Sequence, residues 1–158
     1  MYETILTFHN LLRWVLVISG VLLLVRSAIG LSKKQDWKKN VVNGIRWYTI
    51  AFDLELLAGL VLYFGYSPLT QALFQNFQMA IQIPAMRFFG FIHITLMIIA
   101  LALAHIGRSR VKKALTAVRK YQQTLLWFGI SFGVLLLGVP WPFYAAGRPL
   151  LRLFGLEV

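Results

Sequence analysis

Four long apolar segments, residues 4–31, 44–65, 86–107 and 122–139, constrain the fold of this chain more than any other feature. A helix rises ~1.5 Å per residue, so each segment reaches the length that a membrane-spanning helix needs. The sequence therefore predicts an all-α fold, an integral membrane four-helix bundle that forms a single transmembrane domain over residues 1–158.

The composition agrees with this prediction. Hydrophobic residues make up 59% of the chain and charged residues 13%, whereas a soluble domain carries ~25% charged residues. The sequence contains no cysteine, which excludes disulfides, thiolate metal sites, iron–sulfur clusters and covalent attachment of a c-type haem. No pattern typical of a hydrolase and no glycine-rich phosphate-binding loop is present.

Basic residues concentrate in two of the three connectors between the apolar segments. The connector 31–46 holds Lys33, Lys34, Lys38, Lys39 and Arg46, and the connector 107–121 holds Arg108, Arg110, Lys112, Lys113, Arg119 and Lys120. The positive-inside rule predicts that both lie in the cytoplasm, which places both termini on the opposite side of the membrane. The net charge of +11 is then a topology signal and an attraction for the lipid bilayer, and it does not indicate a nucleic-acid partner.

The first apolar segment is predicted to be a retained helix. A signal peptide has a basic start and a small-residue cleavage site. This segment carries Glu3, has no basic residue before Arg13 and is followed by no such site.

The connector 66–85 holds no basic residue and is predicted to form a short amphipathic helix at the outer membrane surface. Its apolar residues recur at helical spacing, at Leu69, Leu73, Phe77 and Ala80. Its polar face consists of Gln71, Gln75, Gln78 and Gln82. Such a helix either seals the bundle or forms one wall of a site that opens to the outer side.

Two histidines on different predicted helices lie at similar depth. Counting from the outer ends of their segments places His9 ~9 Å along the first helix and His93 ~10 Å along the third. Imidazoles on facing helices supply the axial ligands of b-type haems, so His9 and His93 are candidate haem-iron ligands. The alternative is that each is a hydrogen-bonded histidine of the core or the interface. His105, ~18 Å further along than His93, has no fourth histidine as a partner; we interpret it as an interfacial cap and a weak candidate ligand.

Three charged side chains fall deep within the predicted spans, where an ionisable group requires a partner. Arg13 lies ~15 Å along the first helix, level with Glu55 and Asp53, which lie ~15 and ~18 Å from the outer end of the second. Arg13 could pair with a carboxylate, a backbone carbonyl or a cofactor propionate. Asp53 and Glu55 do not share a helix face, so one could pair with Arg13 while the other faces a cavity or takes up a proton beside a quinone. The alternative is a charge pair that only locks two helices together.

Five short strings, in order along the chain, support a family resemblance. They are Leu6–Trp14, Leu57–Phe64, Met86–Gly90 with His93 following, Ala104–Ser109, and Pro140–Phe143 with Arg148 and Pro149. Together they resemble the small four-helix inner-membrane proteins of Bacteroidetes that are commonly labelled cytochrome b. The resemblance implies non-covalent haem b, with His9 and His93 matching family histidines. Position 53 departs from the pattern, because relatives tend to carry His where this chain has Asp53.

These observations lead to three functional hypotheses. In the first, the protein is a membrane electron carrier in which His9 and His93 hold haem b. Arg13 then meets a propionate, Asp53 or Glu55 handles a proton, and electrons pass between quinone and an outer-side acceptor within a respiratory assembly. In the second, the protein is a cofactor-free accessory or structural subunit of the membrane. In the third, it is a proton-coupled carrier that uses the two carboxylates.

Overall fold

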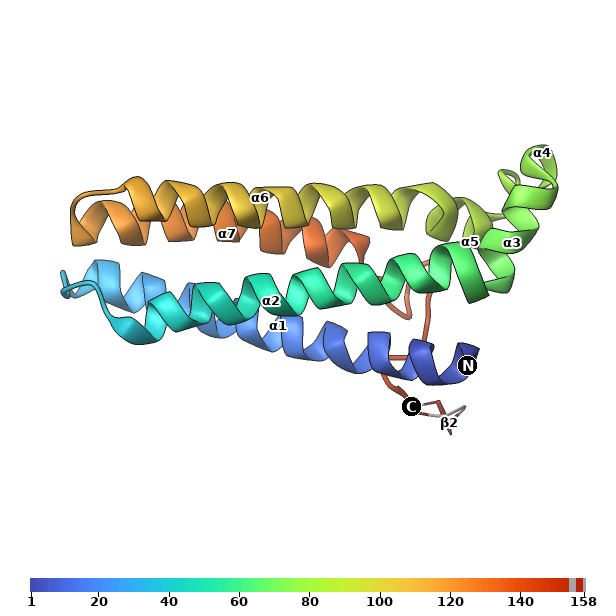
Figure 1. Cartoon of the computed structure of the whole chain (residues 1–158), viewed down its shortest axis with the longest axis horizontal. Helices are drawn as coiled ribbons and strands as arrows, with labels where there is room; N and C mark the ends of the chain where they lie inside the picture. Colours follow the sequence, from blue (N-terminus) through green and yellow to red (C-terminus); the bar gives the residue numbers. More distant parts are fainter. Residues whose placement is uncertain (154–155, 158) are drawn as a thin grey trace.

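The computed structural model describes residues 1–153 and 156–157, and within that part of the chain four long helices lie side by side along the longest axis (Figure 1). They are α1 (Tyr2–Ser32), α2 (Lys39–Val61), α6 (His93–Lys113) and α7 (Ala117–Gly138). Helix α1 packs against α2 and α7, α7 also packs along α6, and α2 meets α6 over a shorter stretch. The predicted all-α fold class is confirmed, and the integral membrane four-helix bundle stays a prediction.

Short elements close the end of the molecule at which the N-terminus lies (Figure 1). Helix α2 continues into a π-helical turn, η1 (Leu62–Tyr66), and α3 (Pro68–Gln75), α4 (Phe77–Ala80) and α5 (Pro84–Arg87) follow. A second π-helical turn, η2 (Phe88–Ile92), leads directly into α6. The C-terminal segment adds the two-residue antiparallel strands β1 (Arg152–Leu153) and β2 (Leu156–Glu157), with β1 against α1.

Among the described residues, three continuous helical runs are long and apolar enough to cross a membrane: Tyr2–Ser32, Lys39–Tyr66 and Pro84–Lys113. They contain the predicted segments 4–31, 44–65 and 86–107 and extend beyond them, because the helices continue into polar residues. Helix α7 corresponds to the fourth segment, 122–139, but its first turns carry Arg119, Lys120, Gln122 and Gln123. That four spans cross a membrane stays a prediction.

Aromatic, aliphatic and small residues fill the interior between the long helices. The largest fully buried side chains include Tyr48, Tyr121, Phe52, Phe128 and Leu16. Small residues let the helices approach closely, since a Cβ atom at Gly107 of α6 would lie 2.6 Å from the Cβ atom of Trp127 in α7. The face of the helical run that contains His93 is buried at Gly90, Met97, Ala100 and Ala104.

A chain of hydroxyl groups crosses this interior and joins three helices. Ser131 of α7 donates to the carbonyl oxygen of Ala100 in α6 at 2.8 Å. Because that hydroxyl has a single proton, Tyr48 of α2 donates to Ser131 Oγ, 3.1 Å away. All three residues are fully buried, so these polar atoms depend on one another for hydrogen bonds.

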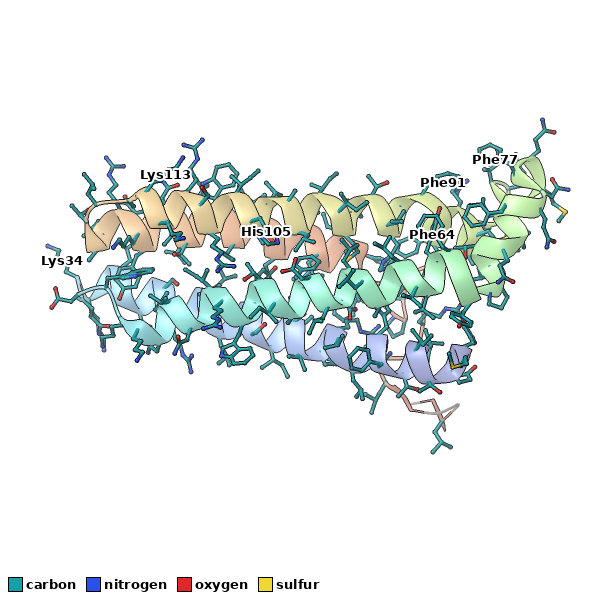
Figure 2. All side chains as sticks on the ribbon, in the orientation of Figure 1. Lys34, Phe64, Phe77, Phe91, His105 and Lys113 are labelled. Atoms are coloured by element: carbon teal, nitrogen blue, oxygen red, sulfur yellow. The ribbon has the colours of Figure 1, made fainter. Side chains whose placement is uncertain are left out.

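The amphipathic helix predicted between the second and third spans is not continuous: it is interrupted at Asn76. Asn76 leaves the helical conformation (φ −145°, ψ 84°), and its side chain accepts a hydrogen bond from the backbone N–H of Met79 at 3.2 Å, which starts α4. The break changes the helical phase, so Leu73 and Ala80 of the predicted apolar stripe are buried while Phe77 is exposed. Figure 2 shows Phe77 at the tip of this end of the molecule.

Candidate functional site

A cavity of about 140 Å³ lies between the long helices at the end that holds the N-terminus. Its wall comes from α1, α2, η1, α3, η2, α6, α7 and the segment that follows α7. Most of the lining is apolar, but the polar side chains around it include His9, Asn10, Arg13, Glu55, His93 and Arg148. The fold therefore brings together four of the six predicted site residues, and Asp53 and His105 lie elsewhere.

The two histidines predicted to share one depth are close neighbours. The ring centroids of His9 and His93 lie 6.3 Å apart, and the ring planes make an angle of 85°. His9 is in the third turn of α1, and His93 is the first residue of α6 after the π-helical turn η2. A π-helical turn contains one extra residue, so residues before and after it do not continue the same helix face. Such turns are frequent at functional sites.

The orientation of His93 is determined by a backbone carbonyl. Its Nδ1 lies 2.7 Å from the carbonyl oxygen of Gly138, at the end of α7. Because a carbonyl oxygen only accepts, Nδ1 carries the proton, and in the neutral ring Nε2 has a free lone pair. The rings of Phe88 and Phe89 pack beside the imidazole, with centroids 6.0 and 5.9 Å away.

His9 is placed by a carboxylate and a glycine of α2. Its Nδ1 lies 3.3 Å from Oε1 of Glu55. The angles fall outside those of a hydrogen bond, so the buried His9 Nδ1 and Glu55 Oε2 have no hydrogen-bond partner among the residues that the structure describes. A Cβ atom at Gly59 would lie 3.3 Å from His9 Cε1 and 3.8 Å from His9 Nδ1, so glycine at this position leaves the imidazole its present room.

Two arginines stand beside the cavity, and the C-terminal segment engages one of them. Arg13 Nη2 and Trp14 Nε1 both donate to the carbonyl oxygen of Leu150, Trp14 at 2.8 Å. The Nε atom of Arg13 is buried without a hydrogen-bond partner in the described part of the chain. Arg148 lies over the ring of Phe89, with its guanidinium carbon 5.2 Å from the ring centroid. Arg13 therefore takes the backbone-carbonyl partner that was one of its three predicted alternatives.

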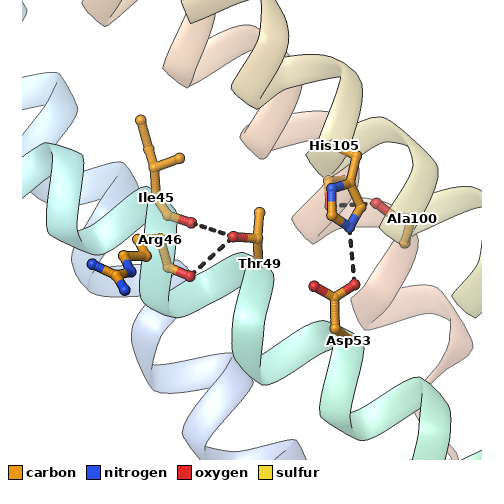
Figure 3. A network of polar contacts seen from close by, with 7 residues as sticks. Ile45, Arg46, Thr49, Asp53, Ala100 and His105 are labelled. Atoms are coloured by element: carbon orange, nitrogen blue, oxygen red, sulfur yellow. Dashed lines mark hydrogen bonds and ion pairs between the residues drawn. The ribbon is translucent and has the colours of Figure 1, made fainter. Parts of the chain in front are cut away.

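The remaining predicted site residues form a separate pair. Asp53 Oδ1 of α2 lies 2.9 Å from His105 Nε2 of α6, as Figure 3 shows. This contact corrects two expectations: Asp53 does not share a site with Arg13, and His105 pairs with a side chain instead of capping a helix end. The reason is the rotation of α2, which turns Glu55 toward the cavity and Asp53 toward α6.

The side chains at the cavity do not form a closed metal cage. No cluster of three or more His, Cys, Asp or Glu residues within residues 1–153 and 156–157 is arranged to hold a metal ion. The imidazoles of His9 and His93 and the carboxylate of Glu55 are the nitrogen and oxygen donors of these residue types at the cavity.

Sequence reasoning missed several contributors to this site. Arg148 was noted only among the sequence strings that support the family resemblance. The carbonyl groups of Gly138 and Leu150 belong to the backbone, so no side-chain type in the sequence marks them as hydrogen-bond acceptors. Tyr63, whose hydroxyl donates to the carbonyl oxygen of Gly90 at 2.8 Å, ties η1 to η2 beside the cavity. A tyrosine near a span end is typical of the membrane interface, so its spacing did not reveal this contact.

Comparison of the chain with models of known families, with curated proteins and with solved structures finds no match.

Proposed function

We propose that this chain is an integral membrane protein that holds a b-type haem between His9 and His93 and transfers electrons. The observation that supports this most is the 6.3 Å separation of the two ring centroids. A metal–imidazole bond is ~2.0–2.1 Å long, so two rings at this separation are near enough to hold one metal ion, and His9 and His93 would be the residues that hold the haem iron.

The contacts of the two Nδ1 atoms support the same proposal. A metal-ligating histidine usually directs its second ring nitrogen to a carbonyl or carboxylate oxygen, which orients the ring. His93 Nδ1 donates to the Gly138 carbonyl at 2.7 Å, which leaves its Nε2 available as a ligand. His9 Nδ1 lies 3.3 Å from Glu55 Oε1, near the carboxylate but without a hydrogen bond to it in the described chain.

The charges near the cavity suit the periphery of a haem. The two haem propionates are anionic and would meet the guanidinium groups of Arg13 and Arg148, which both line the cavity. When bound, the haem would supply a one-electron couple, and the protein would supply the imidazoles of His9 and His93, the apolar surroundings and the two guanidinium groups. Glu55, with a buried oxygen that has no hydrogen-bond partner in the described chain, is placed to hold a proton beside His9.

The volume of the cavity sets a requirement on this proposal. Pockets for organic ligands hold ~300–1,000 Å³, whereas this cavity measures about 140 Å³. A macrocycle therefore needs more room than the described conformation offers. Of the cavity wall, α3 and the stretch after α7 lie outside the four long helices that pack along one another, so a macrocycle would have to gain its room there.

The proposed setting is the bacterial inner membrane, with both termini in the periplasm. The basic connectors lie at the end of the molecule opposite the cavity, where Lys34 and Lys113 are labelled in Figure 2. By the positive-inside rule that end is cytoplasmic. The cavity then lies in the periplasmic half of the bilayer, where quinone, another respiratory subunit or an outer-side electron acceptor would exchange electrons with the haem.

Visible spectroscopy tests the proposal. The chain, produced with haem supplied and purified in detergent, should show a reduced-minus-oxidised difference spectrum of low-spin haem b. His9→Gln and His93→Gln should each abolish it, while His105→Gln, which removes the one imidazole outside the cavity, should leave it unchanged. Absence of haem absorbance from the wild-type protein, or retention of the spectrum in both cavity variants, would refute the assignment.

A cofactor-free accessory subunit is the second candidate. It is favoured by the small cavity and by the contacts that His93, Arg13 and Trp14 already make within the protein. In that case the same side chains only fasten the helices, and no variant binds haem. The proton-coupled carrier is not favoured, because Asp53 and Glu55 face different sides of α2.

A further inference from the structure

The segment that follows α7 folds into a compact loop before it reaches α1. We call residues 140–150 the C-terminal strap; it passes from the end of α7 to the side of α1 (Figure 1). The backbone N–H of Arg148 donates to the carbonyl oxygen of Pro140 at 3.0 Å, which closes the loop between them. A Cβ atom at Gly147 would lie 2.6, 2.7 and 2.8 Å from three backbone carbonyl oxygens of the same loop. Loops with close ends and such internal packing are compact units, so we expect the strap to move as one body.

The strap is attached at two places. On the α7 side, Trp141 Nε1 donates to the carbonyl oxygen of Leu136 at 2.8 Å, a short distance back along the same chain. On the α1 side, Arg13 and Trp14 both donate to the carbonyl oxygen of Leu150. Loss of the α1 attachment would leave the strap joined to α7 alone.

Between these two attachments the strap supplies part of the cavity wall, at Pro140, Arg148 and Pro149. The cavity measures about 140 Å³, whereas a pocket for an organic ligand holds ~300–1,000 Å³. Movement of the strap away from α1 removes this part of the wall and does not separate the four long helices from one another. The strap thus occupies the position of a lid.

Arg13 holds the strap, although its partner there does not match its charge. Its Nη2 donates to a neutral carbonyl oxygen, its Nε atom is buried without a hydrogen-bond partner in the described chain, and it forms no ion pair with any described residue. A guanidinium and a carboxylate form paired, charge-assisted hydrogen bonds, which a single neutral carbonyl cannot supply. Arg13 lines the cavity and is only half-buried, so a carboxylate that arrives there can replace the Leu150 carbonyl.

We propose that the strap is a lid and that Arg13 makes the cavity selective for ligands that carry a carboxylate. Such a ligand takes the guanidinium from the Leu150 carbonyl, which leaves Trp14 as the single donor on the α1 side and lets the strap move outward. A ligand of equal size without a carboxylate leaves both donors in place and the cavity closed. The lid depends on the proposed function for its ligand, because haem brings two propionates, but the haem site alone does not require that Arg13 release the strap.

Limited proteolysis of the full chain in liposomes reports the position of the strap. Trypsin cleaves after arginine, and β1, which follows the strap, contains Arg152, while α5 at the same end of the molecule contains Arg87 and serves as the internal control. Haem should raise the rate of cleavage after Arg152, relative to the rate after Arg87, by about tenfold, the factor for one hydrogen bond to a charged group. Haem dimethyl ester, in which both carboxylates are blocked, should leave this ratio unchanged. An equal effect of the two compounds, or no effect of either, would overturn the lid.

Two arginine variants separate the release of the strap from the loss of a haem contact. Arg13→Gln and Arg148→Gln each remove a guanidinium from the cavity lining, but the Arg148 side chain lies over Phe89 and does not bond Leu150. The cleavage ratio of Arg148→Gln should still rise with haem, whereas that of Arg13→Gln should be the same with haem, with the ester and with neither. A response to haem that survives in Arg13→Gln, or that is lost in both variants, would contradict the proposal. Haem absorbance is read from the same samples: bound haem with an unchanged ratio refutes the lid alone, and no haem absorbance in any sample refutes the proposed function together with it.

Discussion

The buried hydroxyl chain that joins α2, α7 and α6 makes a quantitative prediction about Ser131→Ala. The substitution removes the acceptor of the Tyr48 hydroxyl, which is fully buried and has no other described partner. An unsatisfied buried donor costs ~1–3 kcal/mol, and hydrogen bonds measured between membrane helices average ~0.6 kcal/mol with a maximum near ~1.7. Ser131→Ala should therefore destabilise the protein by ~1–2 kcal/mol.

A double-mutant cycle with Tyr48→Phe separates the cost of leaving the Tyr48 hydroxyl without an acceptor from the other effects of Ser131→Ala. Tyr48→Phe removes the donor and leaves Ser131 bonded to Ala100, so its cost should be ~0.5–1 kcal/mol. In the Tyr48→Phe background there is no Tyr48 hydroxyl to lose its acceptor, so the cost of Ser131→Ala should fall to ~0.5 kcal/mol. The difference between the two costs of Ser131→Ala is the coupling free energy, about 1 kcal/mol.

Equilibrium unfolding in lipid bicelles measures these values. Ser19→Ala is the control, because the Ser19 hydroxyl bonds only to Leu16 of its own helix at 2.9 Å and joins no two helices. Its cost should stay below ~0.5 kcal/mol. If the costs of Ser131→Ala and Tyr48→Phe add to within ~0.5 kcal/mol, the hydroxyl chain does not act as a unit and the donor assignment is refuted.

Four further substitutions test the packing between the helices and around the site. Gly107→Ala places a Cβ atom against α7 and should lower the stability of the protein by ~1–3 kcal/mol. Gly129→Ala has no atom within 4 Å of its Cβ position and should raise the stability by ~0.5–1 kcal/mol. Thermal unfolding measures both, and a reversed ranking of the two variants would contradict the described packing. Trp14→Phe removes one of two donors to the C-terminal segment and should increase the rate at which protease cleaves that segment, and an unchanged rate would show that the bond does not restrain it. Gly59→Ala crowds the His9 ring from 3.3 Å and should alter any haem spectrum without loss of helicity, whereas an identical spectrum would show that this approach is not needed.

The depth of the site residues could be predicted from the sequence, but their neighbours could not. Counting residues placed His9 level with His93, and their rings are 6.3 Å apart. The same counting placed Arg13 level with Glu55, and both line the cavity. Counting gives height along an axis and does not reveal which helices adjoin, so it did not predict that Asp53 turns toward α6.

Local backbone geometry escaped prediction for a different reason. The break at Asn76 depends on one side chain that accepts from a backbone N–H three residues on, and many helices contain asparagine without such a break. The π-helical turn η2 immediately before His93 leaves no signature in hydrophobic periodicity. The acceptor of His93 is a backbone carbonyl, which every residue has.

The bond between Arg13 and the carbonyl of Leu150 joins residues 137 positions apart, nearly the full length of the chain. During synthesis the N-terminal residues therefore wait for almost the whole chain before this contact can form. The part of the cavity wall that Arg148 and Pro149 supply is also made late, after α1, α2 and α6 have been translated. The order of translation thus leaves an interval in which His9 and His93 exist while the cavity still lacks that wall, and a bulky ligand would meet the least obstruction during this interval.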